Sequence, residues 1–244
     1  MINLGAQHEN LDQKAYQIIK EMIMQRQLLP GEKIPQERLA QDLGISRTPL
    51  VSALKFLEQE KLVVAKPRRG YFVRLFSKEE MVYIFELREV LEGLAARRAA
   101  THITDPQIDK LNLFFQQFDP EIAIDDFKAY SQEDRGFHFF VMNIGAKEFL
   151  KSLLLTANII SFSYQVVSSE GLIRSPNETL PEHKVVIDAI SNRDAKEAER
   201  SMRRHFKKSA AVLSSMIEAE AQNQTSFTKD NGIAADILSM RSRG

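Results

Sequence analysis

Cysteine is absent from the 244 residues of this chain. Disulfide frameworks, thiol nucleophiles and thiolate metal sites are therefore excluded. The longest apolar stretches fall far short of the ~20 residues that span a bilayer. The first residues also lack the basic and apolar regions of a secretory signal. These absences predict a cytoplasmic protein that has no membrane partner.

The common short motifs of catalysis are missing as well. The chain contains no HExxH pair, no GxSxG elbow, no P-loop and no dinucleotide fingerprint. We therefore expect a protein that is not an enzyme.

The charge is balanced overall but unevenly distributed. The chain has 33 lysine and arginine residues against 33 aspartate and glutamate residues, which by itself argues against a nucleic-acid binder. Residues 26–74, however, contain ten basic and five acidic residues, a net charge of +5, so the remainder carries −5. A basic segment joined to an acidic remainder predicts two domains with different roles.

Hydrophobic periodicity predicts three helices and a small β-hairpin in the N-terminal part. The helices are expected at 11–27, at 36–43 and from the N-cap Ser46 to about 59, and the β runs at 62–64 and 71–73.

Beyond residue 77, nearly all of the sequence has helical periodicity, so the fold is predicted to be mainly α, with an antiparallel all-helical bundle after the hairpin. Helices are expected at 78–100, from Pro106, at 121–144, at 147–168, from Pro181 to Ser191, and from the cap Asp194 to about Ala221. The predicted domains are 1–76 and 77–221, followed by a flexible tail at 222–244.

The second and third predicted helices, joined by a turn containing Gly44, suit a helix-turn-helix. A helix N-terminus attracts phosphate through its free amides and its dipole, and an arginine there can fork onto a guanine edge. The basic turn of the hairpin suits a wing, although a solvated basic face is the alternative on spacing alone. The candidate DNA-binding residues are Arg38, Ser46, Arg47, Thr48, Ser52, Arg68, Arg69 and Gly70.

Three of the five histidines, His138, His183 and His205, lie on apolar helix faces. Asp134 precedes His138 by four residues, so both project from one helix face. A lone histidine on such a face is usually a core residue. Three of them with a carboxylate suit a divalent transition metal that keeps a position open for water or ligand. Spacing alone leaves the metal site and the structural histidines both open.

The N-terminal part resembles the winged helix-turn-helix of the GntR family of transcription regulators. The resemblance covers about residues 12–75. It rests on Gly31-Glu32-Lys33-Ile34, on Glu37 to Pro49, and on the wing Pro67-Arg68-Arg69-Gly70-Tyr71-Phe72-Val73. Val51 stands where the family usually has a second arginine on the recognition helix, so one DNA contact of the family is expected to be missing.

Residues 78–215 resemble the all-helical, FCD-type effector domain of the FadR subfamily. The matching motifs are Glu86 to Glu92, Asp134-Arg135-Gly136-Phe137-His138, Glu182-His183 and Met202 to Phe206. The resemblance implies a metal on Asp134, His138, His183 and His205, with zinc expected first and nickel or manganese as alternatives. It also implies a small organic acid beside the metal, with Arg88 as an effector-binding residue whose fork suits a carboxylate.

Together these patterns predict a ligand-responsive transcription regulator, more often a repressor in this family, that binds double-stranded operator DNA as a homodimer. The alternative is a metal-dependent enzyme that acts on a small carboxylate and carries a basic, DNA-binding-like appendage. A third interpretation keeps the DNA-binding half and makes the histidines purely structural.

Overall fold

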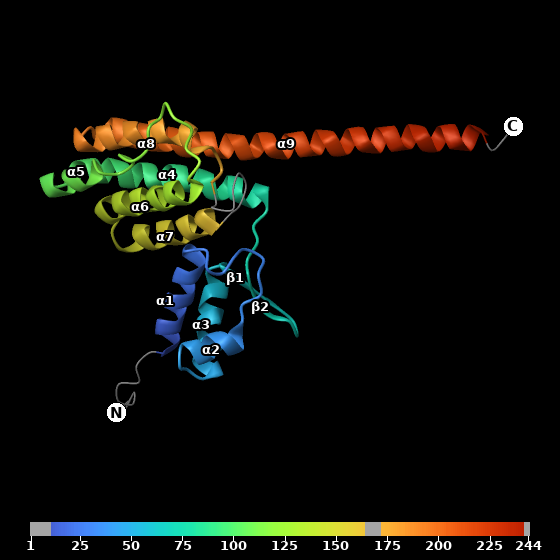
Figure 1. Ribbon diagram of the computed structural model, residues 1–244, viewed down its shortest axis with the longest axis horizontal. Helices are drawn as coiled ribbons and strands as arrows, with labels where there is room; N and C mark the ends of the chain where they lie inside the picture. Colours follow the sequence, from blue (N-terminus) through green and yellow to red (C-terminus); the bar gives the residue numbers. More distant parts are fainter. Residues whose placement is uncertain (1–10, 164–171, 242–244) are drawn as a thin grey trace.

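A basic winged helical domain lies beneath a layered bundle of helices in the computed structural model, which describes residues 11–163 and 172–241. Figure 1 shows α1 rising toward the bundle and the last helix extending far beyond it. The N-terminal elements are α1 (Leu11–Met24), α2 (Gln36–Asp42), α3 (Arg47–Gln59), β1 (Val63–Lys66) and β2 (Gly70–Val73). The predicted order of three helices and a hairpin is confirmed.

The N-terminal domain is held by the apolar stripes of α1 and α3. Ile19 and Ile23 on α1 and Leu50, Leu54 and Leu57 on α3 are all essentially inaccessible to solvent, and the two helices pack directly on each other. Burying a side chain of this size contributes about 1.5–3 kcal/mol. This packing fixes α3, the helix expected to read DNA, on a rigid base.

The wing is an antiparallel hairpin. Val63 of β1 pairs with Val73 of β2 and Lys66 pairs with Gly70, so the connecting residues protrude as a tight turn. Gly70 has a φ of +93°, and a Cβ there would lie 2.8 Å from the Gln36 side chain. Glycine is the residue that tolerates both conditions.

The C-terminal part is helical throughout its described residues. Its elements are α4 (Lys78–His102), α5 (Asp105–Leu111), α6 (Phe127–Gly145), α7 (Glu148–Ser163), α8 (Pro176–Ser191) and α9 (Ala195–Arg241). α4 is central and packs on α6, α7, α8 and α9. The C-terminal end of α6 lies against α4 so closely that a Cβ on Gly145 would be 1.8 Å from the Ala95 carbonyl oxygen.

Three predicted helix limits were wrong. The helix expected at 121–144 begins at Phe127, because the Asp126 side chain accepts a hydrogen bond from the Ala129 amide at 2.9 Å and starts the helix there. The helix expected to open at Pro181 begins five residues earlier, at Pro176. The signal was present in the sequence: Glu178 reaches back to the Ser175 amide at 2.9 Å, as in a capping box.

The third wrong limit is the end of the last helix. We expected it near Ala221, but α9 continues to Arg241. α7 is described to Ser163, so residues 164–168 of the predicted helix fall outside the described residues, as do residues 242–244 of the predicted tail. Within the described ranges, no helix is both long and apolar enough to cross a membrane.

Candidate DNA interface and metal centre

The N-terminus of α3 presents polar side chains to solvent. Ser46 occupies the N-cap position without making a side-chain capping bond. Ser46, Arg47 and Thr48 are all exposed. The free amides of this helix end and the three side chains therefore face outward together, as a phosphate-binding helix N-terminus requires.

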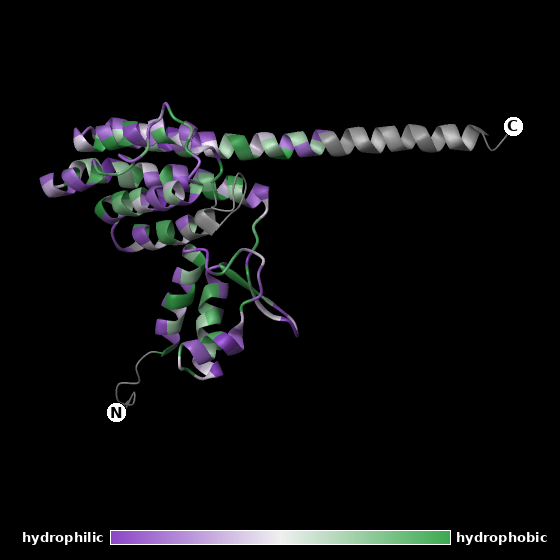
Figure 2. Cartoon of the chain, in the orientation of Figure 1, coloured by the Kyte–Doolittle hydropathy of each residue, from purple (hydrophilic) through white to green (hydrophobic). Residues whose placement is uncertain are grey.

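The wing carries its cations on the exposed turn. Arg68 and Arg69 are exposed, and Arg68 adopts a left-handed conformation with φ +60°. The Arg69 amide donates to the Lys66 carbonyl oxygen at 3.0 Å, which closes the turn. Figure 2 shows this tip as a hydrophilic end to the hairpin.

An open groove of about 750 Å³ joins α2, the start of α3 and the wing. It is lined by five of the predicted DNA-binding residues: Arg38, Arg47, Arg68, Arg69 and Gly70. A second hollow of about 460 Å³ shares Arg47, Arg68 and Gly70, and Val51 forms part of its wall. The fold thus gathers cations from three elements around one concave surface.

Ser52 is placed differently from the other predicted DNA-binding residues. It is half-buried, and its hydroxyl donates to the Asp12 carboxylate on α1 at 3.2 Å. Like Ser46 and Thr48, it lines neither of the two hollows. In this arrangement Ser52 ties α3 to α1.

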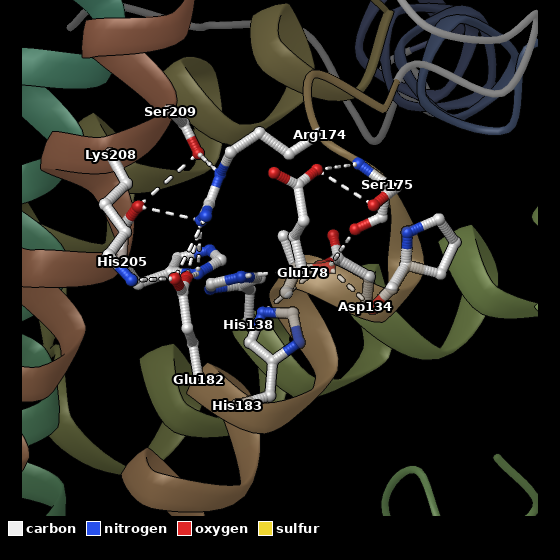
Figure 3. A network of polar contacts seen from close by, with 12 residues as sticks. Asp134, His138, Arg174, Ser175, Glu178, Glu182, His183, His205, Lys208 and Ser209 are labelled. Atoms are coloured by element: carbon white, nitrogen blue, oxygen red, sulfur yellow. Dashed lines mark hydrogen bonds and ion pairs between the residues drawn. The ribbon is translucent and has the colours of Figure 1, made fainter. Parts of the chain in front are cut away.

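The three predicted histidines come together inside the helical domain. His138 lies on α6, His183 on α8 and His205 on α9, and all three are buried. One ring nitrogen from each lies within 4.8 Å of the others. Figure 3 shows the three rings converging from separate helices.

Each of these histidines uses Nδ1 for a hydrogen bond within the protein. His138 Nδ1 lies 2.6 Å from Glu92 Oε2, and His205 Nδ1 lies 2.9 Å from Glu182 Oε2. His183 Nδ1 lies 3.2 Å from the Tyr130 hydroxyl. In metal-binding histidines, a bond of this kind at Nδ1 leaves Nε2 available to the metal.

Asp134 lies on α6 beside two of the three histidines. Its Oδ1 lies 3.4 Å from His183 Nε2 and 3.8 Å from His138 Nε2. His183 Nε2 is buried and has no hydrogen-bond partner among the described residues. A buried nitrogen of this kind calls for a bound water or ion, and the neighbouring donor atoms fit a metal ion.

The surroundings keep two of the imidazoles neutral. Burial, reinforced by the neighbouring cationic groups, lowers the pKa of His183 well below its ordinary value. Burial also lowers the pKa of His205, although Glu182 opposes this. A neutral imidazole has the free electron pair that binds a metal.

Arg88 forms a buried ion pair. Its Nε donates to Glu92 Oε1 at 2.8 Å, and the two side chains are 3% and 2% exposed. Burial alone would raise the pKa of Glu92, but Arg88 and then His138 lower it to about 2. Arg88 also lines a cavity of about 40 Å³ together with Asp134, His138 and His205. It therefore lies beside Asp134, His138 and His205 while being bonded to Glu92.

Sequence reasoning missed three residues that support the site. Glu92 had a signal, since it follows Arg88 by one helical turn. Glu182 adjoins His183 in sequence yet bonds His205, and Arg174 lies outside any helix. Only the folded chain brings these two to the histidines.

Two family models match the chain. Residues 11–73 match the model described as bacterial regulatory proteins, gntR family, and residues 83–208 match the FCD domain. The chain belongs to the GntR family. Its FCD domain agrees with the FadR subfamily, and it is a DNA-binding transcriptional regulator. The matched families and relatives are regulators rather than enzymes, so the metal-dependent enzyme is not supported.

The curated relatives match this GntR-family chain over most of its length. It is 24% identical over 225 residues to the HTH-type transcriptional repressor RspR of Escherichia coli, covering 90% of this chain and 95% of RspR. It is 26% identical over 238 residues to the Uxu operon regulator of Haemophilus influenzae, covering 89% of each.

Solved structures share the fold. The chain aligns with McbR/YncC of Escherichia coli at a TM-score of 0.68 and 18% identity, covering 85% of this chain and 98% of that one. A GntR regulator from Rhodococcus sp. RHA1, described as a putative transcriptional regulator, aligns at 0.66 and 18% identity, covering 83% and 96%. Both confirm a winged helical domain followed by a helical bundle.

Proposed function

We propose that this regulator is a homodimeric cytoplasmic repressor whose helical domain binds a divalent metal and a small organic acid. The metal, zinc or else nickel or manganese, would be held by Asp134, His138, His183 and His205. The observation that carries the proposal is the orphaned, buried Nε2 of His183, placed among two other imidazoles and a carboxylate. Three imidazoles and one carboxylate suit a transition metal with room for a further ligand.

The charges around the site favour an anionic effector. Glu92 is paired with Arg88, and Glu182 with Arg174. A divalent ion beside Asp134 would exceed the negative charge of that carboxylate by one unit. When bound, the metal supplies a Lewis-acidic position at which a carboxylate can complete the coordination.

The space at the site favours a small effector. The cavity of about 40 Å³ is lined by Arg88 and His138 and also by Ile173, Thr179 and Ser209. Arg88 is the residue through which the effector would first be sensed, because its guanidinium contacts both this cavity and Glu92. Because pockets for drug-sized ligands have volumes of about 300–1,000 Å³, a cavity this small disfavours a large ligand.

Helix α4 offers the route from effector to DNA. It carries Arg88 and Glu92, and its N-terminus follows the wing strand β2 by four residues. Arg74 in that connection forms an ion pair of 2.5 Å with Glu80 on α4. A shift of α4 would therefore move the wing. The coupling free energy between two such sites is typically ~1–3 kcal/mol.

The proposal is tested first by the metal content of tag-free protein purified without chelators. We expect about one equivalent of a transition metal per chain, the number of sites that this donor set can form. The loaded protein is then titrated with a panel of mono-, di- and tricarboxylates while its melting temperature and its affinity for an enriched DNA duplex are followed.

A carboxylate that raises the melting temperature and weakens DNA binding only when metal is present supports the proposal. Transcription from a promoter overlapping the duplex should fall when the protein is added and recover with that acid. Protein that stays free of metal after incubation with zinc, nickel and manganese would contradict the metal site. A rise in transcription on adding the protein would contradict the repressor.

A further inference from the structure

Two buried carboxylates in this protein each link one arginine to one histidine of the candidate metal centre. The first link, Arg88–Glu92–His138, runs within α4 and across to α6. The second runs from Arg174 through Glu182 of α8 to His205 of α9. The two links reach different histidines from different elements, yet each ends on an Nδ1 atom.

The second link is the more elaborate one. Arg174 Nη1 donates to Glu182 Oε1 at 3.0 Å, and Nη2 donates to Oε2 at 2.5 Å, so the pair is bidentate. The Arg174 side chain is 4% exposed and that of Glu182 is 13% exposed. Figure 3 shows the guanidinium, the carboxylate and the His205 ring in succession.

Arg174 also holds the backbone and the helix face around His205. Its Nη2 lies 3.2 Å from the His205 carbonyl oxygen, and its Nε donates to the Ser209 hydroxyl at 3.1 Å. Nη2 also lies 3.3 Å from His205 Nδ1, the ring atom that contacts Glu182. One guanidinium therefore contacts the main chain and the ring of residue 205 and also holds the carboxylate that bonds that ring.

We propose that Arg174 and Glu182 are positioning residues for the metal centre, which they serve without contacting the metal. The bidentate fork holds both carboxylate oxygens of Glu182 in one plane. Oε2 then stays on Nδ1 of His205, so that Nε2 of that ring faces the other ligands. Arg88 and Glu92 do the same for His138. This inference rests on the metal site of the proposed function.

The chain contains a matched control for the second link. Lys208 also contacts Glu182, with Nζ 2.7 Å from Oε1, but its side chain is 54% exposed. It contacts Oε1, whereas His205 Nδ1 contacts Oε2. If Glu182 acted only as a general anionic group, loss of Lys208 and loss of Arg174 would have the same effect on metal affinity. If Glu182 orients the His205 ring, only the loss of Arg174 should lower metal affinity.

The test compares Glu182→Gln, Arg174→Met, Arg174→Lys and Lys208→Met in the full chain. Zinc affinity is measured by competition with a chromophoric chelator, and the visible spectrum of the cobalt(II)-loaded protein reports the ligand geometry. We expect Glu182→Gln and Arg174→Met to weaken zinc binding by about 10- to 100-fold and to alter the cobalt spectrum. Lys208→Met should change affinity by no more than about twofold, because exposed ion pairs contribute little.

Arg174→Lys keeps the positive charge without the fork, and its zinc affinity should fall between those of the wild type and Arg174→Met. It also supplies the measurement if Arg174→Met fails to fold. The double variant Arg174→Met/Glu182→Gln should bind zinc no more weakly than whichever single variant binds it less tightly, because the two residues act as one unit.

The inference is overturned if Glu182→Gln and Arg174→Met bind zinc with wild-type affinity and show an unchanged cobalt spectrum. This holds even if their metal-free forms melt at a lower temperature than the metal-free wild type. That result would make the link purely structural. A wild-type protein that binds neither metal would instead overturn the metal site itself, so the two failures are distinguishable.

Discussion

Glu92 Oε2 lies 2.6 Å from His138 Nδ1, and both side chains are 2% exposed. The partner that makes this contact tolerable is Arg88, whose Nε donates to the other oxygen of Glu92 at 2.8 Å. A buried carboxylate needs a compensating charge and hydrogen bonds on both oxygens. The contact therefore ties the stability of the helical domain to the geometry of the candidate metal centre.

Replacing Arg88 with Met should leave Glu92 as an uncompensated buried charge and lower the free energy of unfolding by about 3–5 kcal/mol. The measurement is urea unfolding in the presence of a chelator, so that metal binding does not contribute. Arg97→Met is the control on the same helix, because Arg97 is 49% exposed in its pair with Glu199. It should cost about 0–1 kcal/mol. Equal losses in the two variants would refute the buried-pair argument.

Zinc should stabilise the wild type but not the variant His183→Ala. A metal bound only by the folded state adds about 2.7 kcal/mol at 100 times its dissociation constant, and loss of one ligand removes most of that gain. The stabilisation by zinc is measured as the difference in melting temperature between samples with zinc and samples with a chelator. His102→Ala is the control, because His102 is exposed at the end of α4 and bonds the Arg98 carbonyl. It should keep the full zinc response.

Arg47→Ala should weaken DNA binding and reduce the slope of log affinity against log salt by about one, because one fewer counterion is released. Fluorescence anisotropy at several salt concentrations measures both, with a duplex that the wild type enriches from random-sequence DNA. Lys110→Ala removes an equally exposed cation from α5 in the helical domain and should change neither quantity. Wild-type affinity and slope in Arg47→Ala would remove Arg47 from the interface.

Gly145→Ala should destabilise the helical domain by about 1–3 kcal/mol or more, as overpacking of a closed contact does. The added Cβ would lie 1.8 Å from the Ala95 carbonyl oxygen, a backbone atom that cannot move without α4. Gly136→Ala, also on α6, meets only the Phe114 side chain at 3.3 Å. It should be close to neutral, because the helix preference of alanine over glycine, about 1 kcal/mol, offsets the cost of moving the Phe114 ring slightly. Equal melting temperatures for the two variants would argue against the close approach.

Most of the fold could be predicted because local patterns control it. The Gly44 turn, the apolar stripes of α1 and α3 and the basic turn before Gly70 predicted the winged domain. The start of α8 was misplaced because Pro181 looked like a first-turn proline. The helix instead begins at the cap of Ser175 and Glu178 and includes Pro181 in its second turn.

The candidate metal centre was predicted only as a list of side chains. Asp134 and His138 share a helix face by spacing, but nothing local places His183 and His205 beside them. Arg88 was predicted to meet an effector, and its side chain is bonded to Glu92 one turn further along α4. The contact that required α4 to pack against α6 is the one between Glu92 and His138. Ser52 was predicted to face DNA, yet its hydroxyl is bonded to Asp12 on α1.

Sequence alone predicted the helical periodicity, the caps and the basic winged segment, because these depend on residues within a few turns of one another. It also predicted which side chains could bind a metal, because that depends on residue type. The tertiary structure decided which carboxylate bonds which histidine. Glu182 precedes His183 but bonds His205, and Arg174 reaches both Glu182 and Ser209 from a connection outside the helices. Such contacts depend on how separate helices pack, and sequence spacing does not encode that arrangement.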